Sequence, residues 1–76
     1  MYFGKEILSM DKKKLGKKIK IARIEKDLSQ VQLAELMKAK QKSISSYETG
    51  SAVPSIETLL KISKILEKPV TYFLDE

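Results

Sequence analysis

A chain of 76 residues has room for one domain, near the lower size limit at which a single hydrophobic core sustains a fold. It contains no cysteine, which excludes disulfides and thiolate metal sites and fits a reducing cytoplasm. No apolar run approaches the roughly 20 residues of a membrane span, and the first residues lack the apolar stretch of a secretory signal. The formal net charge is +5, and residues 12–42 hold eleven Lys and Arg against three Asp and Glu. A solvated lysine-rich surface explains the total, but the asymmetry favours a polyanionic partner.

The chain is predicted to divide into an N-terminal leader, residues 1–10, and one helical domain, residues 11–76. The leader is too short to be a domain. It nevertheless carries two aromatic and two aliphatic side chains: Tyr2, Phe3, Ile7 and Leu8.

The first helix is expected over about residues 12–26, with Ser9 or Asp11 as its N-cap. Apolar residues spaced i, i+4 and i+7 predict its core face: Leu15, Ile19 and Ala22. Ile21 and Ile24 lie on nearly the opposite face, and a small helix rarely leaves a second apolar stripe uncovered. We expect the leader to cover it; the alternative is a second subunit.

Two short helices joined by a tight turn are predicted next, over about residues 30–37 and 41–48. Ser29 followed by Gln32 matches a capping box, and Gly50 suits the left-handed residue after the second helix. Apolar or small residues recur where two crossed helices must touch: Leu33, Ala34, Met37, Ala39, Ile44 and Tyr47.

After a loop over residues 50–54, Ser55 is expected to cap a helix that ends near Leu66. Pro69 suits the first turn of a short last helix, VTYFL. The longer of these helices is expected to bury its apolar residues: Ile56, Leu59, Leu60, Ile62 (in part), Ile65 and Leu66. The fold class is therefore all-α, with five short helices around one core.

The helix over residues 41–48 and the residue before it carry a polar and basic outer face. Between the apolar positions stand only Lys40, Gln41, Lys42, Ser43, Ser45 and Ser46. These side-chain types hydrogen-bond base edges and phosphates. Because any exposed helix face is polar, polarity alone proves little, but the surrounding positive charge supports a DNA-contacting helix.

The stretches LGKKIKIARIEKDLSQVQLAEL and ISSYETGSAVPSIETLLKISKIL resemble the lambda-repressor-like, Cro/phage-repressor-type (XRE-type) helix-turn-helix family over about residues 13–74. The linked features are LSQ opening the second helix, LA at its centre, the IS…YE…G run, and P-S-x-x-T-L-L. The resemblance implies a compact five-helix domain that binds a short DNA palindrome as a homodimer. It also implies a cytoplasmic, DNA-associated protein of a prokaryote or phage, without a cofactor.

Carried over residue by residue, the resemblance implies base reading by Gln41, Lys42, Ser45 and Ser46. It implies contacts with the DNA backbone by Gln30, Lys40, Ser43 and Thr49. Arg23 and Glu48 match positions that commonly form a structural ion pair between helices. The homodimer is expected to use the last helix and the end of the helix before it, with the loop over residues 50–54 as a further candidate. The residues expected there, with Phe73 mainly in the core, are Val70, Tyr72, Phe73 and Leu74.

Three residues depart from the family pattern. Lys38 stands where the turn usually has glycine, so either it adopts a left-handed conformation, at a cost of roughly 1 kcal/mol, or the turn changes. Lys40 replaces the usual serine or threonine cap of the third helix and cannot accept a bond from its N–H groups. Glu67 replaces the glycine that often closes the fourth helix.

The leading functional interpretation is a sequence-specific transcriptional regulator, most simply a repressor or a small controller protein. The alternative is an antitoxin-like module that neutralises a partner protein and binds DNA secondarily. A non-specific nucleic-acid binder is the fallback. An enzyme is disfavoured, since the chain has no histidine, no cysteine, no metal-ligand cluster and no phosphate-binding loop. No small-molecule substrate, metal or membrane contact is expected.

Overall fold

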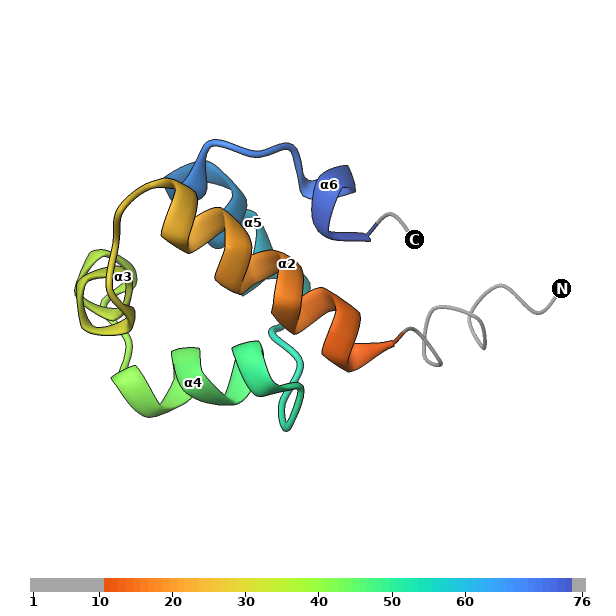
Figure 1. The fold of residues 1–76 in the computed structure, drawn as a ribbon, viewed down its shortest axis with the longest axis horizontal. Coiled ribbons are helices and arrows are strands. Elements are labelled where there is room, and N and C mark those ends of the chain that lie inside the picture. The colour runs from red at the N-terminus through yellow and green to blue at the C-terminus, as the bar shows by residue number, and fades with distance from the viewer. Residues whose placement is uncertain (1–10, 75–76) are drawn as a thin grey trace, which may run out of the picture.

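The computed structural model describes residues 11–74, and in this range it contains five helices around one core (Figure 1). They are α2 (Lys12–Glu25), α3 (Gln30–Met37), α4 (Gln41–Thr49), α5 (Ile56–Leu66) and α6 (Val70–Leu74). The predicted all-α class is confirmed. The leader, and with it the expected cover over the outer side of α2, lies outside the described residues. No helix within residues 11–74 has the length and apolarity needed to cross a membrane.

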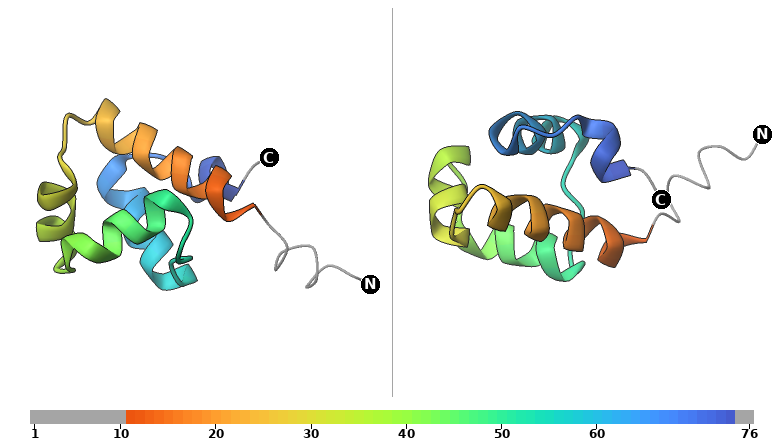
Figure 2. Two further views of the ribbon diagram at one scale, coloured as in Figure 1. Left: turned by 60° about the horizontal axis from the view of Figure 1, so that its bottom comes forward. Right: turned by 45° about the horizontal axis from the view of Figure 1, so that its top comes forward.

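Helix α2 is the central element of the fold. It packs against α4 on one side and against α5 and α6 on another, while α3 packs against α4 and α5 (Figures 1 and 2). The buried hydrophobic residues of the core, each at most 7% exposed, come from all five helices: Leu15, Ile19, Ala22, Leu33, Ala34, Met37, Ile44, Leu59, Ile62, Leu66 and Phe73. The predicted core face of α2 is therefore confirmed.

The predicted helix starts are confirmed by their hydrogen bonds. The Asp11 side chain accepts from the backbone N–H of Lys13 and Lys14 at the start of α2. Ser29 and Gln32 form the reciprocal capping box of α3, with the Gln32 N–H donating to Ser29 Oγ at 3.0 Å. At the start of α5, Ser55 Oγ accepts from the backbone N–H of Thr58 at 3.1 Å. These side chains satisfy backbone donors that have no partner inside their helices.

The helix ends include strained backbone where the chain departs from the family pattern. Lys38 (φ 56°) adopts the left-handed conformation, which was one of the two predicted outcomes, and Glu67 (φ 58°) and Asp27 (φ 58°) adopt it as well. After Lys38 the Ala39 N–H donates to the Ala34 carbonyl at 2.9 Å, which closes the turn between α3 and α4. Lys40 gives α4 no side-chain cap bond, so packing of its apolar side must hold this helix in place.

Two expectations about buried positions were wrong. In α5, Leu59 and Ile62 face the core, whereas Ile56 and Leu60 are 66% and 49% exposed. The core-facing stripe is narrower than expected because it follows an i, i+3, i+7 spacing, and the other two residues lie beside it. Ala39, which was expected at the helix crossing, is exposed because it lies in the turn.

Candidate nucleic-acid interface

Helix α4 buries one side and exposes the other. Ile44 is fully buried, Tyr47 is half-buried, and both pack into the core. Lys42 lies on the opposite face, and a helical repeat places three more polar side chains beside it at i+3, i+4 and i+7: Ser45, Ser46 and Thr49. The fold thus brings half of the eight predicted DNA-contacting residues onto one polar surface.

The remaining predicted contact residues lie around the start of α4. Gln41 and Lys40 are exposed there, and Ser43 is half-buried on the flank of the helix. Gln30 begins the neighbouring helix α3 and its side chain reaches α4. The Thr49 hydroxyl lies at the other end, where it donates to the Ser46 carbonyl at 3.3 Å.

Behind this surface lies a buried ion pair between Arg23 of α2 and Glu48 of α4. Arg23 Nε lies 2.6 Å from Glu48 Oε2, and Arg23 Nη2 donates to Glu48 Oε1 at 3.1 Å. The third guanidinium nitrogen, Nη1, donates to the Leu28 carbonyl at 2.7 Å. The two charged residues are only 8% and 7% exposed. A bidentate pair of this kind fixes the relative position of the two helices.

The ion pair continues to the surface through two glutamines. Gln30 Nε2 donates to Glu48 Oε1 at 3.0 Å, and Gln41 Nε2 donates to Gln30 Oε1 at 3.3 Å. We call the four residues the polar chain: Arg23, Glu48, Gln30 and Gln41.

The polar chain sets the orientation of the exposed amide. A carboxylate only accepts hydrogen bonds, so Glu48 turns the NH₂ group of Gln30 inward and its oxygen outward. That oxygen takes one hydrogen from Gln41. The Gln41 oxygen and its second hydrogen remain available, and they are the donor–acceptor pair that matches the N6 and N7 positions of adenine.

Positive charge on this side is not neutralised by nearby carboxylates. The ion pairs within residues 11–74 join Arg23 to Glu48, Lys26 to Glu67 and Lys68 to Glu25, and they leave Lys40 and Lys42 out. Lys13 of α2 adds to this charge, because it lies against Gly50 at the end of α4. An uncompensated cluster of this kind suits a phosphate backbone.

Sequence reasoning missed Gly16, although this glycine positions α4. A Cβ atom added there would lie 2.5 Å from the Glu48 carbonyl oxygen and would also collide with the Tyr47 carbonyl oxygen. Backbone therefore meets backbone where α2 crosses α4, and only glycine fits. The signal was a lone glycine inside a predicted helix. Glycine in a helix interior lowers stability by about 1 kcal/mol relative to alanine, so its presence there indicates a position where close packing requires it.

Comparison with known families agrees with this geometry. A family model described as "Helix-turn-helix" matches residues 19–73, from the middle of α2 to the end of α6. The chain belongs to the Cro/C1-type (XRE) helix-turn-helix family. In this helix-turn-helix domain α3 is the first helix of the motif and α4 is the recognition helix.

Three relatives share this domain. A proposed HTH-type transcriptional regulatory protein of Pyrococcus horikoshii is 33% identical over 60 residues, which cover 79% of this chain and 19% of that protein. Multiprotein-bridging factors 1b and 1a of Arabidopsis thaliana are 44% and 40% identical over 52 residues, which cover 68% of this chain and 37% of each of them. The chain thus spans between a fifth and two fifths of the length of these relatives.

Proposed function

We propose that the protein is a transcriptional regulator that binds palindromic operator DNA as a homodimer, with α4 in the major groove. The polar chain carries this proposal, because it holds the exposed Gln41 amide in one orientation beside Lys42. A side-chain amide that is already held in one orientation loses less conformational entropy when it pairs with a base. Occupation of a promoter by the dimer would exclude RNA polymerase, which makes repression the simplest outcome.

The proposed contacts divide into two groups. Gln41 pairs with adenine and Lys42 donates to guanine O6 and N7, while Ser45 and Ser46 make shorter contacts one turn later. Backbone phosphates are contacted near the ends of the two motif helices by Gln30, Lys40, Ser43 and Thr49. The N-terminus of α3 suits a phosphate because its free N–H groups point outward.

Replacement of Lys42 by alanine tests the role of α4. In selection from random duplexes, the unchanged protein should enrich a palindrome, and Lys42→Ala should relax the preference at one position of each half-site. The expected loss is about 1–3 kcal/mol of discrimination there. Lys64→Ala, an exposed lysine of α5, is the matched control and should leave the consensus unchanged. Salt-sensitive binding without an enriched sequence would show a non-specific binder instead.

The residues of α6 that are predicted to form the homodimer interface differ in how exposed they are. Phe73 is only 2% exposed, so it cannot contribute to an interface. Tyr72 is half-buried: its ring packs edge-on to Phe73, and the ammonium groups of Lys18 and Lys68 lie 5.7 and 5.0 Å from its centre. Val70 is half-buried as well, and Leu74 is the most exposed residue of the predicted set.

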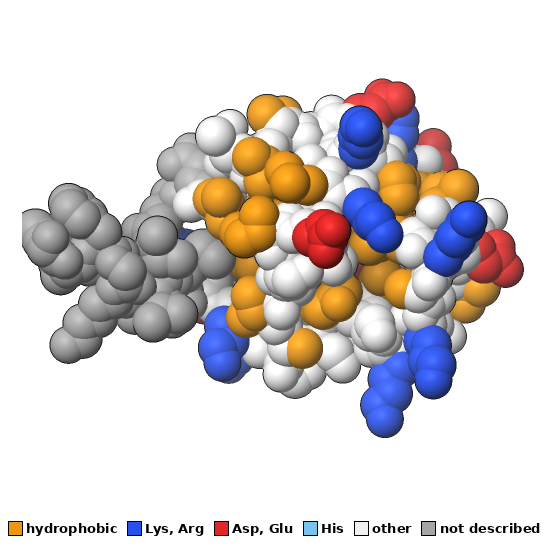
Figure 3. Space-filling view, turned by 180° about the vertical axis from the view of Figure 1, so that it is seen from behind, with side chains coloured by type: hydrophobic (Ala, Val, Ile, Leu, Met, Phe, Trp, Pro, Cys, Tyr) orange, Lys and Arg blue, Asp and Glu red, His pale blue; other side chains and the backbone are white. Residues whose placement is uncertain are grey.

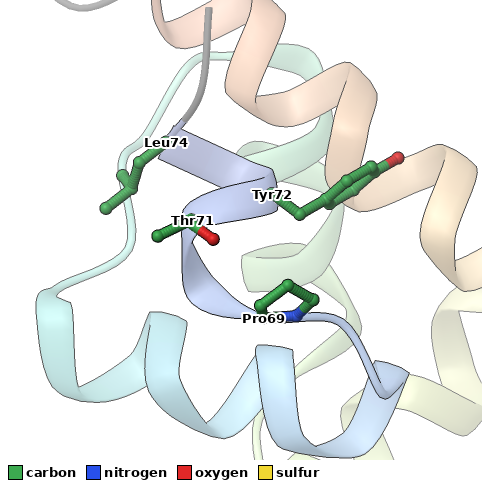
Figure 4. Close-up of a pocket in the computed structure, with 4 residues that line it drawn as sticks. All are labelled: Pro69, Thr71, Tyr72 and Leu74. Atoms are coloured by element: carbon green, nitrogen blue, oxygen red, sulfur yellow. The ribbon is translucent and has the colours of Figure 1, made fainter.

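Leu74 belongs to a larger apolar surface formed with α5 and the loop before it. Four residues, each 40–66% exposed, form what we call the apolar patch: Val53, Ile56, Leu60 and Leu74. Figure 3 shows hydrophobic side chains gathered on this face. Leu74 borders a shallow hollow lined by Pro69, Thr71 and Tyr72, and it points toward the loop that leads into α5 (Figure 4). An apolar surface of this kind is typical of a protein interface.

Two paired substitutions test the apolar patch as the dimer interface. Ile56→Ser with Leu60→Ser should reduce the sedimentation mass to that of a monomer. It should also weaken operator binding by more than tenfold, because two half-sites are then no longer bound together. Ile21→Ser with Ile24→Ser, an equal loss of apolar surface on α2, is the control. A dimer that survives the first pair would place the interface elsewhere.

A second candidate function is the antitoxin-like module that acts through a partner protein and binds DNA secondarily. The names of the two plant relatives, multiprotein-bridging factors, favour a protein partner. A folded protein that enriches no duplex in the selection experiment, with or without added salt, would support this candidate over the regulator.

A further inference from the structure

Helix α2 has a solvent face that the DNA-binding proposal does not use. It lies opposite the buried residues of the helix, and every side chain on it is exposed. We call it the lysine–isoleucine face: Lys14, Lys17, Lys20, Ile21 and Ile24. The two isoleucines are 49% and 53% exposed and stand three residues apart, and Lys17 lies between them on the helical repeat.

The positive charge of this face is not balanced from within the described chain. No ion pair or hydrogen bond within residues 11–74 engages the side chains of Lys14, Lys17 or Lys20. The acidic residue at the edge of the face, Glu25, is paired with Lys68 of the α5–α6 connection at 3.1 Å. The two exposed isoleucines are thus flanked by three lysines that form no ion pair with a carboxylate of residues 11–74.

The lysine–isoleucine face is separate from the other two surfaces. On α2 it points away from α4, which packs on Gly16, and away from α6, whose Tyr72 carbonyl accepts from Lys18. In Figure 1, α2 crosses in front of α5 and α4 runs below it. A ligand on the outer side of α2 therefore leaves both the recognition helix and the apolar patch accessible.

We propose that the lysine–isoleucine face docks an acidic amphipathic segment of another protein. Apolar residues spaced i, i+3 or i+4 in that segment would cover Ile21 and Ile24, and flanking Asp and Glu would pair with the lysines. This is the binding of a helix by its apolar face, with charge complementarity setting the partner and the orientation.

The charge of the face favours an acidic partner over the other occupants. A second copy would bring three lysines against three lysines. DNA would satisfy the lysines but leave both isoleucines in contact with phosphate and water. A membrane-surface helix requires a broader apolar face than two residues provide. The leader contains one lysine and one glutamate, so its side chains bring no net negative charge.

A titration of the isotopically labelled full chain tests the proposal. The probe is a short synthetic helical peptide with leucines at i, i+3, i+4 and i+7 and glutamates elsewhere. Saturable amide shifts are expected at Lys17, Lys20, Ile21 and Ile24, with an affinity that falls as salt rises. Ile21→Ser with Ile24→Ser should weaken binding about tenfold or more, as loss of central apolar contacts does.

The matched control is Val31→Ser with Leu36→Ser, which removes two exposed apolar side chains from α3 and should leave peptide binding unchanged. Because peptide binding is measured in the absence of DNA, the result does not depend on whether the protein binds an operator. The proposal is overturned if no saturable shift appears, if the shifts map to the apolar patch, or if the α2 pair leaves the affinity unchanged. It is also overturned if Ile21→Ser with Ile24→Ser abolishes binding to DNA or to phosphatidylserine vesicles, because DNA or a membrane would then be the ligand of this face. If Ile7→Ser with Leu8→Ser strengthens peptide binding more than tenfold, the leader is the occupant of the face and the proposal is likewise overturned.

Discussion

Replacing Gly16 by alanine is expected to lower the free energy of unfolding by about 2 kcal/mol and to displace the recognition helix. The added methyl group would lie 2.5 Å from the Glu48 carbonyl oxygen, and its neighbours are backbone atoms of α4 rather than flexible side chains. The two helices must move apart, and overpacking of this kind costs about 3 kcal/mol where backbone has to move. The higher helix propensity of alanine returns about 1 kcal/mol.

Thermal unfolding and DNA binding check this result together. For a domain of this size, a loss of about 2 kcal/mol corresponds to a decrease of roughly 10 °C in Tm. Lys20→Ala is the control, because it adds alanine to the exposed side of the same helix and should change the Tm little. If Gly16→Ala leaves both the Tm and the selected DNA sequence unchanged, α2 and α4 do not cross as closely as the structure indicates.

The helices and their boundaries could be predicted from the sequence because their signals are local. Asp11, Ser29 and Ser55 each cap the helix that follows, within three residues. The left-handed conformations of Lys38 and Glu67 were predictable from the family pattern, which has glycine there. Asp27 was missed because neither composition nor pattern distinguishes it from an ordinary loop residue.

Burial in α5 could not be predicted, because apolar spacing does not show how much of a helix its neighbours cover. Leu60 and Leu59 are adjacent leucines in the sequence, but only Leu59 faces the core. The same uncertainty applies to the residues proposed for the dimer interface. The buried Phe73 and the exposed Leu74 differ only in which side of the short α6 each occupies.

The site could be predicted in outline but not in its connections. Exposure of Gln41 and Lys42 follows from the apolar positions of α4, and the ion pair of Arg23 with Glu48 from the family resemblance. The link between them through Gln30 joins side chains 11 and 18 residues apart. No local pattern encodes a contact over that distance, so only the three-dimensional structure shows that the exposed Gln41 amide is linked to the buried ion pair.

Replacing Glu48 by glutamine is expected to have the largest effect of any single conservative change, about 3–5 kcal/mol of lost stability. The substitution keeps the shape of the side chain but leaves the Arg23 guanidinium buried without a counter-charge. The glutamine oxygen can also replace only one of the two carboxylate oxygens, so its NH₂ group stands at the other position and faces donors: Arg23 Nε at one position, or Arg23 Nη2 and Gln30 Nε2 at the other. Chemical denaturation measures this loss, and a change below about 1 kcal/mol would contradict it.

A second variant separates the structural role of Glu48 from its proposed role in recognition. Arg23→Met combined with Glu48→Leu removes both charges, and replacement of a buried ion pair by apolar residues is often neutral or stabilising. This variant should therefore fold about as stably as the unchanged protein. It nevertheless removes the acceptor that orients Gln30, which in turn orients Gln41. Selection from random duplexes should then show a weaker preference at the position read by Gln41, while the position read by Lys42 is retained. If the full preference is kept, the polar chain only stabilises the fold and does not set the orientation of the recognition amide.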